Sequence, residues 1–339
     1  MTAKYKASYD ENRTCLADVL PLTAPYTIYI EPTKICNFKC FYCMHSTRDM
    51  VDGIFSQTGY KTNNIDESLF DKIVKEIMEF PVEPKRIVFS GLGEPLCNKK
   101  LPEMISKLRQ ANFTGRIDMI TNGALLNKAL SDRLITAGVS RIQISLQGIN
   151  GDQYEKNCGY KMDYEKFVDE LTYLYSNKQD TSIFIKIIDA LVDNKEDKDK
   201  FFVTFEPICD TIFIEHLIVL QQEMGDHNGI VDKTKNFNNE EFKSRDVCPV
   251  TTYHLQISAE GYTFPCPVPG LPTKFSLGNV NETTLLQIWN GAKRKGLIRS
   301  HLMKNKNKME VCGTCFACAA VLDENENLDD RAHELLKLF

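Results

Sequence analysis

Cysteine content constrains this protein more than any other feature of its sequence. The 339-residue chain has 12 cysteines, three of them between residues 36 and 43 and three between 312 and 318. Residues 1–13 are polar and charged, and no apolar stretch follows them, so the sequence predicts neither a signal peptide nor a membrane anchor. We therefore expect a protein of the reducing cytoplasm, where clustered thiols are better explained as metal ligands than as disulfides.

Length and charge limit the classes of function that this protein can have. Hydrophobic residues make up 42% of the chain, enough to bury a full core and to build about two domains. The formal charge is −5, from 41 basic and 46 acidic residues, without a long basic run. Nucleic acid is therefore disfavoured as a partner, because phosphate binding requires a positive field. Nothing in the sequence indicates a membrane.

Short β-branched runs alternate with segments of helical period from Tyr26 onward, which predicts repeated strand and helix units around a parallel sheet. Two amphipathic helices are expected at Glu67–Phe80 and Tyr164–Leu174. Six strands are predicted: Thr27–Glu31, Arg86–Ser90, Ile117–Thr121, Arg141–Ser145, Ser182–Lys186 and Thr211–Glu215.

The pattern changes after Leu220. Residues Gln221–Lys243 are polar and aperiodic and are interpreted as a linker, so we expect one domain over residues 1–235 and a second over 236–339. The second domain is predicted to contain a hairpin (His254–Ser258 and Tyr262–Phe264) turning at Gly261, where glycine permits positive φ.

A short helix, Thr284–Asn290, is expected to follow the hairpin, with Trp289 as its core anchor. The tail from Leu322 to Asp330 is acidic and is predicted to be exposed, with a helical turn or two after it.

Three cysteines form a C-x3-C-x2-C motif, Cys36, Cys40 and Cys43, just after the first predicted strand. Three thiolates at this spacing suit three irons of a cubane cluster and leave the fourth iron open. Zinc is the alternative, but it normally takes four ligands, and the nearest further candidate is His45.

The motif in its setting, Ile30-Glu31-Pro32-Thr33-Lys34-Ile35-Cys36-Asn37-Phe38-Lys39-Cys40-Phe41-Tyr42-Cys43, resembles the radical S-adenosylmethionine (radical SAM) superfamily. Gly91, Gly93 and Glu94, within Ser90–Pro95, look like the family's GGEP motif with one residue inserted. The resemblance implies that SAM binds the open iron of a [4Fe-4S] cluster and is cleaved to a 5′-deoxyadenosyl radical. It also implies that Glu94 contacts the SAM amino group, since a carboxylate beside an ammonium forms a charge-assisted hydrogen bond.

The resemblance covers about residues 27–220 and implies an α/β fold, a partial (β/α)6 TIM-type barrel with chemistry at the C-terminal ends of its strands. Further SAM contacts are expected at the ends of the later strands. Ser145-Leu146-Gln147-Gly148 has Gln147 where the family's S-x-D-G motif has an acid. The expected cofactor-binding residues, with those already named, are Tyr42, Asn122, Ser145, Gln147 and Lys186, the last as a carboxylate partner.

A second set of cysteines follows the barrel: Cys248, Cys266, Cys312, Cys315 and Cys318. With Leu285–Gly291, this set looks like the small C-terminal SPASM or twitch domain, in which cysteines hold auxiliary [4Fe-4S] clusters. Five cysteines cannot complete two four-thiolate cubanes. We therefore expect one auxiliary cluster on Cys248, Cys266, Cys312 and Cys315, with Cys318 as a doubtful alternate. A structural zinc site is the alternative.

Four other residues are weaker candidates. Cys97 and Cys158 follow loops at the mouth of the predicted barrel and are candidates for returning a hydrogen atom to a substrate radical, although lone cysteines are usually buried structural residues. Glu215 and His216 end the sixth predicted strand and are candidates for substrate recognition or for a general base.

These features together predict a radical SAM oxidoreductase that dehydrogenates a small molecule similar to a carbohydrate or aminocyclitol. The expected cofactors are SAM, a [4Fe-4S] cluster and one auxiliary [4Fe-4S] cluster, and the expected electron donor is a flavodoxin or ferredoxin. The alternatives are an enzyme that modifies peptides or proteins, an epimerase, and a non-enzymatic iron–sulfur electron carrier or redox sensor.

Overall fold

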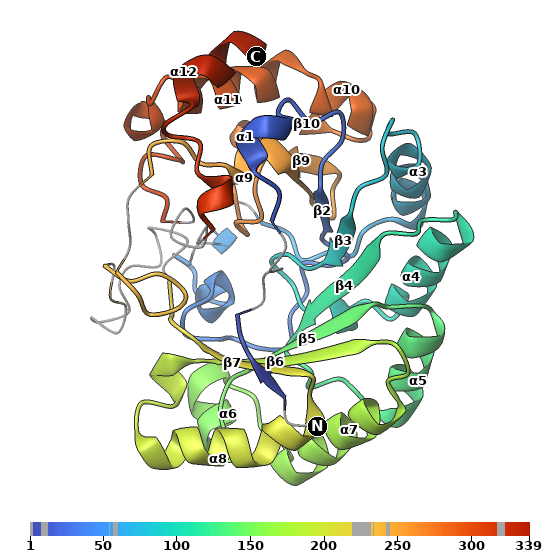
Figure 1. The fold of residues 1–339 in the computed structure, drawn as a ribbon. Helices are drawn as coiled ribbons and strands as arrows, with labels where there is room; N and C mark the ends of the chain where they lie inside the picture. The colour runs from blue at the N-terminus through green and yellow to red at the C-terminus, as the bar shows by residue number, and fades with distance from the viewer. Residues whose placement is uncertain are drawn as a thin grey trace. The chain divides into compact units, whose positions relative to one another are not determined.

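The computed structural model describes residues 3–7, 13–53, 55–56, 60–218, 232, 234–241, 245–316 and 323–339 (Figure 1). They form two compact units. The first unit consists of Met1–Ser8, Glu31–Asn64 and Val88–Leu217, and the second of Tyr9–Ile30, Ile65–Ile87 and Ile218–Phe339. The predicted domain boundary after residue 235 stays a prediction.

The first unit is built on strands that follow the order β1-β7-β6-β5-β4-β3. The pairs β4–β5, β5–β6, β6–β7 and β1–β7 are parallel. Five of the six predicted strands lie here wholly or in part, and the short β1 had no sequence signal. The strands are β1 (Lys4–Tyr5), β3 (Arg86–Phe89, which begins in the second unit), β4 (Arg116–Thr121), β5 (Arg141–Leu146), β6 (Ser182–Ile188) and β7 (Thr211–Glu215).

Helices alternate with these strands, as the periodicity predicts, and α4, α5 and α7 run along one side of them in Figure 1. Four of the helices begin at an Asn or Asp whose side chain accepts a hydrogen bond from a backbone N–H of the first turn. They are α4 (Leu101–Gln110), α5 (Lys128–Thr136), α6 (Gly151–Cys158), α7 (Tyr164–Asn177) and α8 (Lys195–Phe205).

The second unit contains the remaining strands, in the order β3-β2-β8-β9-β10. β2 (Thr27–Ile30) pairs in parallel with β8 (His254–Ile257), and β8, β9 (Tyr262–Phe264) and β10 (Gly278–Asn279) pair antiparallel. The predicted hairpin is confirmed, with Gly261 at φ 86°.

Of the helices of the second unit, three contribute buried residues to an apolar cluster that includes Leu16, Ile298, Leu328 and Leu335. The prediction of an exposed acidic tail holds at Glu324, Asn325 and Asp330 but is wrong at Glu326 and Leu328, which are buried, Leu328 within this cluster. The helices are α1 (Leu16–Val19), α3 (Glu67–Ile77), α9 (Val250–Tyr253), α10 (Leu285–Trp289), α11 (Ala292–Leu302) and α12 (Ala332–Leu335).

Trp289 is the core anchor that the sequence predicts, since its side chain is fully buried. Its indole N–H donates to the Leu22 carbonyl at 3.0 Å. The Arg294 guanidinium lies 3.3 Å from the indole centroid and donates to the Thr252 carbonyl at 2.6 Å. A buried cation is stabilised here by a ring face and by carbonyl acceptors.

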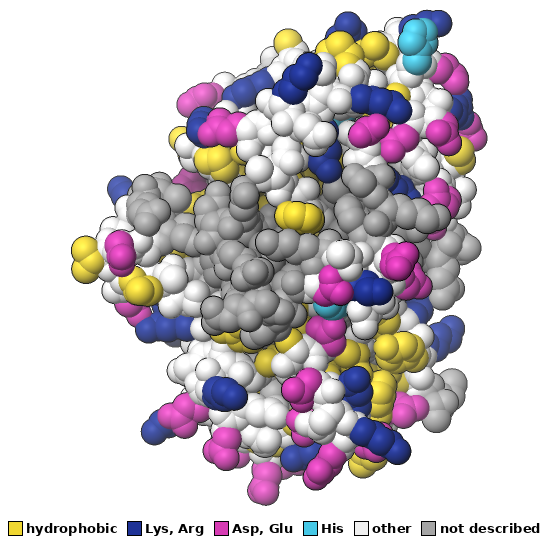
Figure 2. All heavy atoms as spheres, turned by 90° about the vertical axis from the view of Figure 1, so that its left-hand side faces the viewer, with side chains coloured by type: hydrophobic (Ala, Val, Ile, Leu, Met, Phe, Trp, Pro, Cys, Tyr) yellow, Lys and Arg dark blue, Asp and Glu magenta, His cyan; other side chains and the backbone are white. Residues whose placement is uncertain are grey.

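Some predictions lie outside the described residues: most of the linker Gln221–Lys243, and Cys318. Among the described residues, none of the helices has the length and apolarity that crossing a bilayer requires. In Figure 2, basic and acidic side chains are interspersed over the described part of the face shown.

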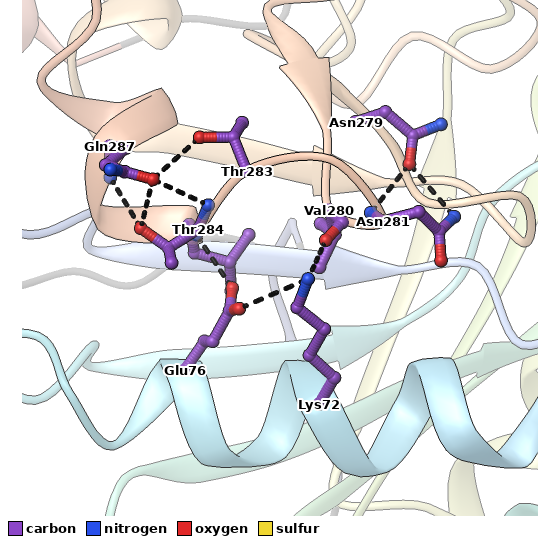
Figure 3. A network of polar contacts seen from close by, with 9 residues as sticks. Lys72, Glu76, Asn279, Val280, Asn281, Thr283, Thr284 and Gln287 are labelled. Atoms are coloured by element: carbon purple, nitrogen blue, oxygen red, sulfur yellow. Dashed lines mark hydrogen bonds and ion pairs between the residues drawn. The ribbon is translucent and has the colours of Figure 1, made fainter.

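A polar network joins α3 to the segment after β10 (Figure 3). The buried Glu76 accepts from the backbone N–H of Leu285, the first residue of α10, at 2.8 Å, and Lys72 donates to the Val280 carbonyl. Thr284 and Gln287 form a capping box at the same helix start. The beginning of α10 is therefore fixed both by its own cap and by α3.

Candidate metal and cofactor sites

Cys36, Cys40 and Cys43 lie in the first unit, in the loop that follows β2, which we call the cluster loop (residues 36–48). Burial and the nearby charges of Glu94 and Cys43 raise the pKa of Cys36 to about 12. The pKa of Cys40 is also raised, by a hydrogen bond with Cys158, by burial and by the charge of Cys43. The three thiols are thus close enough to affect one another's ionisation, as ligands of one cluster must be.

Two basic side chains fasten the cluster loop. Arg48 donates to the carbonyls of Cys36 at 2.6 Å and Phe38 at 3.0 Å. His45 is buried, with Nε2 3.0 Å from the Leu92 carbonyl and Nδ1 3.4 Å from Arg48. Burial lowers the pKa of His45 to about 4, so it is neutral near pH 7. Both ring nitrogens are engaged, which gives no support to His45 as a zinc ligand.

Glycines let the loop after β3 pack tightly against the chain before the cluster loop. A Cβ on Gly93 would stand 2.3 Å from the Thr33 carbonyl oxygen, closer than a Cβ can approach a non-bonded atom unless the backbone shifts. At Gly91 a Cβ would meet the Glu31 side chain at 2.7 Å. The Glu31 carboxylate is buried and accepts from the Leu92 N–H at 2.6 Å. Glu31 was not among the sequence-predicted site residues.

Glu94 holds three donors inside the fold. Its carboxylate accepts from the Thr121 hydroxyl at 2.6 Å, the Asn122 N–H at 2.7 Å and the Leu96 N–H at 3.0 Å. Burial nevertheless raises the pKa of Glu94 to about 7. Since a carboxylate offers about four acceptor positions, the capacity to accept one further donor remains. Its contact with the SAM amino group stays a prediction. In the structure, Glu94 also joins the loop after β3 to the end of β4.

Asn122 reaches the cluster loop directly. Its Nδ2 donates to Asn37 Oδ1 at 2.8 Å, and the Cys97 thiol lies 4.0 Å from the same oxygen. Burial, followed by the charge of Glu94, raises the pKa of Cys97 to about 11. The structure therefore places both Asn122 and Cys97 at the side chain of Asn37, the residue after the first cysteine of the motif.

Tyr42 and Gln147 meet on the other side of the loop. The Tyr42 hydroxyl donates to Gln147 Oε1 at 2.8 Å, and Asn157 donates to the Gln147 carbonyl at 2.9 Å. Gln147, which replaces the acid of the family motif, thus serves as a hydrogen-bond acceptor for the cluster loop. The two side chains bond to each other, and their contacts with SAM stay a prediction.

Two acid–base pairs stand at the C-terminal ends of β6 and β7. Lys186 donates to Glu215 at 2.6 Å, and the two side chains are only 18% and 12% exposed. His216 Nδ1 lies 2.5 Å from Asp189 Oδ2. Ser145 is the register partner of Lys186 on β5, so it lies beside this group. Asp189 was missed by sequence reasoning because it follows its strand in a short 3-10 turn (Asp189–Leu191) with no motif.

The second unit brings four of the five later cysteines together. Burial raises the pKa of Cys266 well above its usual range, and the thiols of Cys315, Cys248 and Cys312 add smaller contributions in the same direction. Cys266 and Cys315 also pack against an apolar cluster containing Phe264. His301, also missed, is fully buried, with Nδ1 3.4 Å from the Cys248 backbone N–H.

The donor sets fit iron–sulfur clusters: three thiols for a cluster with one open iron, and four for a closed one. Within the described part of the chain, no three His, Cys, Asp or Glu side chains form a group that would hold a single metal ion. In a cubane each thiolate binds a different iron, so its ligands need not converge on one point as the ligands of zinc do.

Two family models match the chain. The radical SAM superfamily model matches residues 30–200, just over half of the chain, and the SPASM iron–sulfur cluster-binding domain matches residues 248–316. These matches confirm the resemblance on which the sequence interpretation rests. They also confirm the expected cofactors, SAM with a [4Fe-4S] cluster and auxiliary iron–sulfur chemistry.

A curated relative is the probable GTP 3′,8-cyclase of Methanococcus maripaludis strain C5, which is 39% identical over 124 residues. That match covers 37% of this chain and 37% of the relative. The chain therefore matches little more than a third of that protein's length.

Solved structures share the fold over most of the chain. BtrN in complex with AdoMet and 2-DOIA has a TM-score of 0.56 at 19% identity, covering 88% of this chain and 96% of BtrN. Native anSMEcpe with bound AdoMet and Kp18Cys peptide has a TM-score of 0.57 at 16% identity, covering 91% and 95%. At these identities the likeness concerns the fold alone, and it confirms the predicted fold class.

Proposed function

This chain belongs to the radical SAM superfamily, and on that premise we propose that it dehydrogenates a small polyhydroxylated molecule, similar to a carbohydrate or aminocyclitol. Cys36, Cys40 and Cys43 would hold the [4Fe-4S] cluster that binds SAM. Cys248, Cys266, Cys312 and Cys315 would hold one auxiliary [4Fe-4S] cluster. When bound, these groups supply a radical that removes a hydrogen atom and an acceptor for one electron.

The observation that carries the proposal is the Lys186–Glu215 pair. Parallel α/β sheets place their chemistry at the C-terminal ends of the strands, where this pair lies. A nearly buried ion pair is costly to build, because both charges lose contact with water. The pair suits a substrate with neighbouring hydroxyl or amino groups, since Glu215 accepts hydrogen bonds and Lys186 donates them.

The chain's own residues would then complete the oxidation. Loss of a hydrogen atom from a C–H bond beside a hydroxyl leaves a carbon radical. Loss of the hydroxyl proton and one electron turns that radical into a carbonyl, so two hydrogens leave in total. Glu215 would take this proton as general base. Asp189 would orient His216, because their side chains are hydrogen-bonded.

Other functions predict different outcomes. An enzyme that modifies peptides, as the ligand of anSMEcpe suggests for that protein, would act on peptides and not on cyclitols. A nucleotide cyclase, as the Methanococcus relative is named, would act on GTP. An epimerase would leave the substrate's mass unchanged. An electron carrier has no need to cleave SAM.

The test is anaerobic incubation of the reconstituted protein with SAM, a reductant and separate panels of aminocyclitols, amino sugars, peptides and GTP. We expect 5′-deoxyadenosine to form and one aminocyclitol or sugar to lose two hydrogen masses. Absence of 5′-deoxyadenosine would remove the enzyme assignment. Product from peptides or GTP alone would replace the proposed substrate class. A flavodoxin or ferredoxin, the proposed natural donor, can then be compared with the chemical reductant.

A variant tests the proton acceptor separately. Glu215→Gln should lower oxidised product roughly 10²- to 10⁴-fold while 5′-deoxyadenosine still forms, because the base acts after hydrogen abstraction. Glu196→Gln, on the exposed side of α8, is the matched control. An equal effect of both variants would exclude Glu215 as the base.

A further inference from the structure

Asn37 lies in the cluster loop, directly after the first cysteine of the motif, and its amide belongs to a chain of hydrogen bonds. The backbone N–H of Ala124 donates to Asn122 Oδ1 at 3.0 Å, so the Asn122 amide turns its nitrogen the other way. That nitrogen donates to Asn37 Oδ1 at 2.8 Å, and the Cys97 thiol lies 4.0 Å from the same oxygen. These bonds fix which atom of the Asn37 amide is the oxygen, because only an oxygen accepts from the Asn122 nitrogen.

The other atom of this amide, Asn37 Nδ2, is buried and has no hydrogen-bond acceptor among the described residues. An amide nitrogen carries two N–H donors, and nearly all buried donors in folded proteins have a partner. The amide cannot turn over to find one, because the Asn122 donor would then face a nitrogen. We therefore expect Asn37 Nδ2 to meet an acceptor that the chain itself does not supply.

The neighbouring groups indicate which acceptor this is. Glu94 accepts from the Asn122 backbone N–H at 2.7 Å, and it is expected to hold the SAM ammonium because it can accept one further donor. SAM is an α-amino acid, so its carboxylate is bonded to the same carbon as that ammonium. A carboxylate has only acceptors to offer, so it needs donors of its own close to Glu94.

Most donors around Glu94 already have partners. The backbone N–H groups of residues 122–124 all donate to side chains of this network. The Asn122 amide gives one N–H to Asn37 and keeps one. Asn37 Nδ2 keeps both of its own. Most of the unused amide donors of this network therefore belong to Asn37.

We propose that Asn37 binds SAM, with its Nδ2 donating to the carboxylate of the methionine moiety. This inference rests on the proposed function, since it requires the [4Fe-4S] cluster and SAM at the cluster loop. The unsatisfied buried donor is also the feature of the structure that fits SAM here: an acceptor is lacking, and SAM brings one. Sequence reasoning selected Glu94 and Asn122 for SAM but not Asn37, although Asn37 stands inside the motif.

The expected effect is specific to one group of the ligand. Hydrogen bonds to ionised groups are the stronger kind, so loss of this one should weaken SAM binding roughly ten- to a hundredfold. Decarboxylated SAM keeps the ammonium, the sulfonium and the adenosine but has no carboxylate, so it should not register the loss. A disturbed network would weaken both ligands alike, so the comparison separates a direct contact from a structural role.

The experiment measures the dissociation constants of SAM and decarboxylated SAM by anaerobic calorimetry on the full-length reconstituted protein, without reductant so that SAM stays intact. Asn37→Ala removes the donor without adding charge. Asn37→Asp removes the donor but keeps an oxygen for Asn122. Asn177→Asp, which adds the same charge at the exposed last residue of α7, is the control. Iron content and circular dichroism check loading and folding.

We expect both Asn37 variants to weaken SAM binding roughly ten- to a hundredfold without weakening decarboxylated SAM, and Asn177→Asp to change neither. Equal fold-changes for the two ligands would overturn the inference, because Asn37 would then only support the network. Unchanged SAM affinity would also overturn it, because Nδ2 would then donate to solvent.

Wild-type protein decides the matter if neither Asn37 variant loads iron. Decarboxylated SAM that binds about tenfold more weakly than SAM, or weaker still, supports the carboxylate contact, and a smaller difference contradicts it. A wild-type protein that loads iron but binds no SAM would instead refute the proposed function.

Discussion

The two cysteine sets reach similar arrangements by opposite routes. Cys36, Cys40 and Cys43 come from one loop, and contacts that need no metal hold this loop: Arg48, His45 and the end of α6. The second set comes from three separate stretches of the second unit, at residues 248, 266 and 312–315. The first site is therefore prepared by local sequence and its supports, whereas the second depends on tertiary folding, with metal as one of the forces that holds it together.

The largest effect is expected when the first set of cysteines is removed and the second is left in place. Replacing Cys36, Cys40 and Cys43 with Ala should abolish SAM cleavage and halve a total of about eight irons, because only the second cubane remains. Anaerobic reconstitution with iron analysis and a 5′-deoxyadenosine assay measures both. The exposed Cys15→Ala is the control, and retained cleavage in the triple variant would refute the assignment.

Removing ligands of the auxiliary cluster should spare SAM cleavage and stop the oxidation. Cys312→Ala with Cys315→Ala should remove the auxiliary iron, spare SAM cleavage and stop formation of oxidised product, since the electron then has no acceptor. Circular dichroism must first show a folded protein, because metal ligation also stabilises small domains. Product at the normal rate from a folded variant would make this cluster structural and favour a redox-neutral reaction such as epimerisation.

Glu94 should have an intermediate effect. Glu94→Gln loses the charge beside the SAM ammonium, worth about 1.5–3 kcal/mol, or roughly ten- to a hundredfold in the SAM dissociation constant. The Gln side chain also has an NH2 group, which would face one of the three donors that Glu94 accepts from and could not accept its hydrogen bond. Thr121→Val, which removes one donor only, is the milder control. An unchanged dissociation constant would remove Glu94 from the site.

The same residue predicts a pH dependence. The Glu94 pKa is raised to about 7 by burial, so its carboxylate gains a proton as the pH falls through that value. The charged form is the one that binds an ammonium, so SAM affinity should fall between pH 8 and pH 6 in wild type and stay flat in Glu94→Gln. Calorimetric titration of SAM at several pH values tests this, and parallel curves would contradict it.

The smallest expected effect concerns the metal-free protein. Chelation of iron should raise backbone hydrogen exchange more in residues 312–316 than in residues 36–48. The cluster loop keeps its hydrogen bonds without metal, so its amides should stay protected. Residues 312–316 have few such bonds, so they should open and exchange faster once the metal is removed. Mass spectrometry of exchanged peptides measures the difference, and a larger increase in the cluster loop would reverse the comparison drawn above.

Local patterns predicted the elements that depend on local forces. Short β-branched and aromatic runs indicated the six strands, all of which form within a few residues of the predicted bounds. The hairpin at Gly261 and the buried Trp289 also follow from nearby sequence. The prediction of an exposed tail was wrong at Glu326 and Leu328, because the acidic composition of the segment gave no sign that Leu328 packs into a core formed with other parts of the chain.

The sequence alone determined the chemistry available to this protein: three thiols in one loop, glycines beside a glutamate, and a second set of cysteines. The tertiary structure decided which side chains contact one another. Strand register sets Lys186 opposite Phe213, two residues before Glu215, and its side chain reaches the Glu215 carboxylate. Backbone hydrogen bonds from Lys39 and Phe41 dock the cluster loop on the end of α6. Glu31 became a site residue only through its contact with Leu92, 61 residues later in the chain. Such pairings join residues far apart in the chain, so no local spacing encodes them, and only packing selects which polar groups share a buried space.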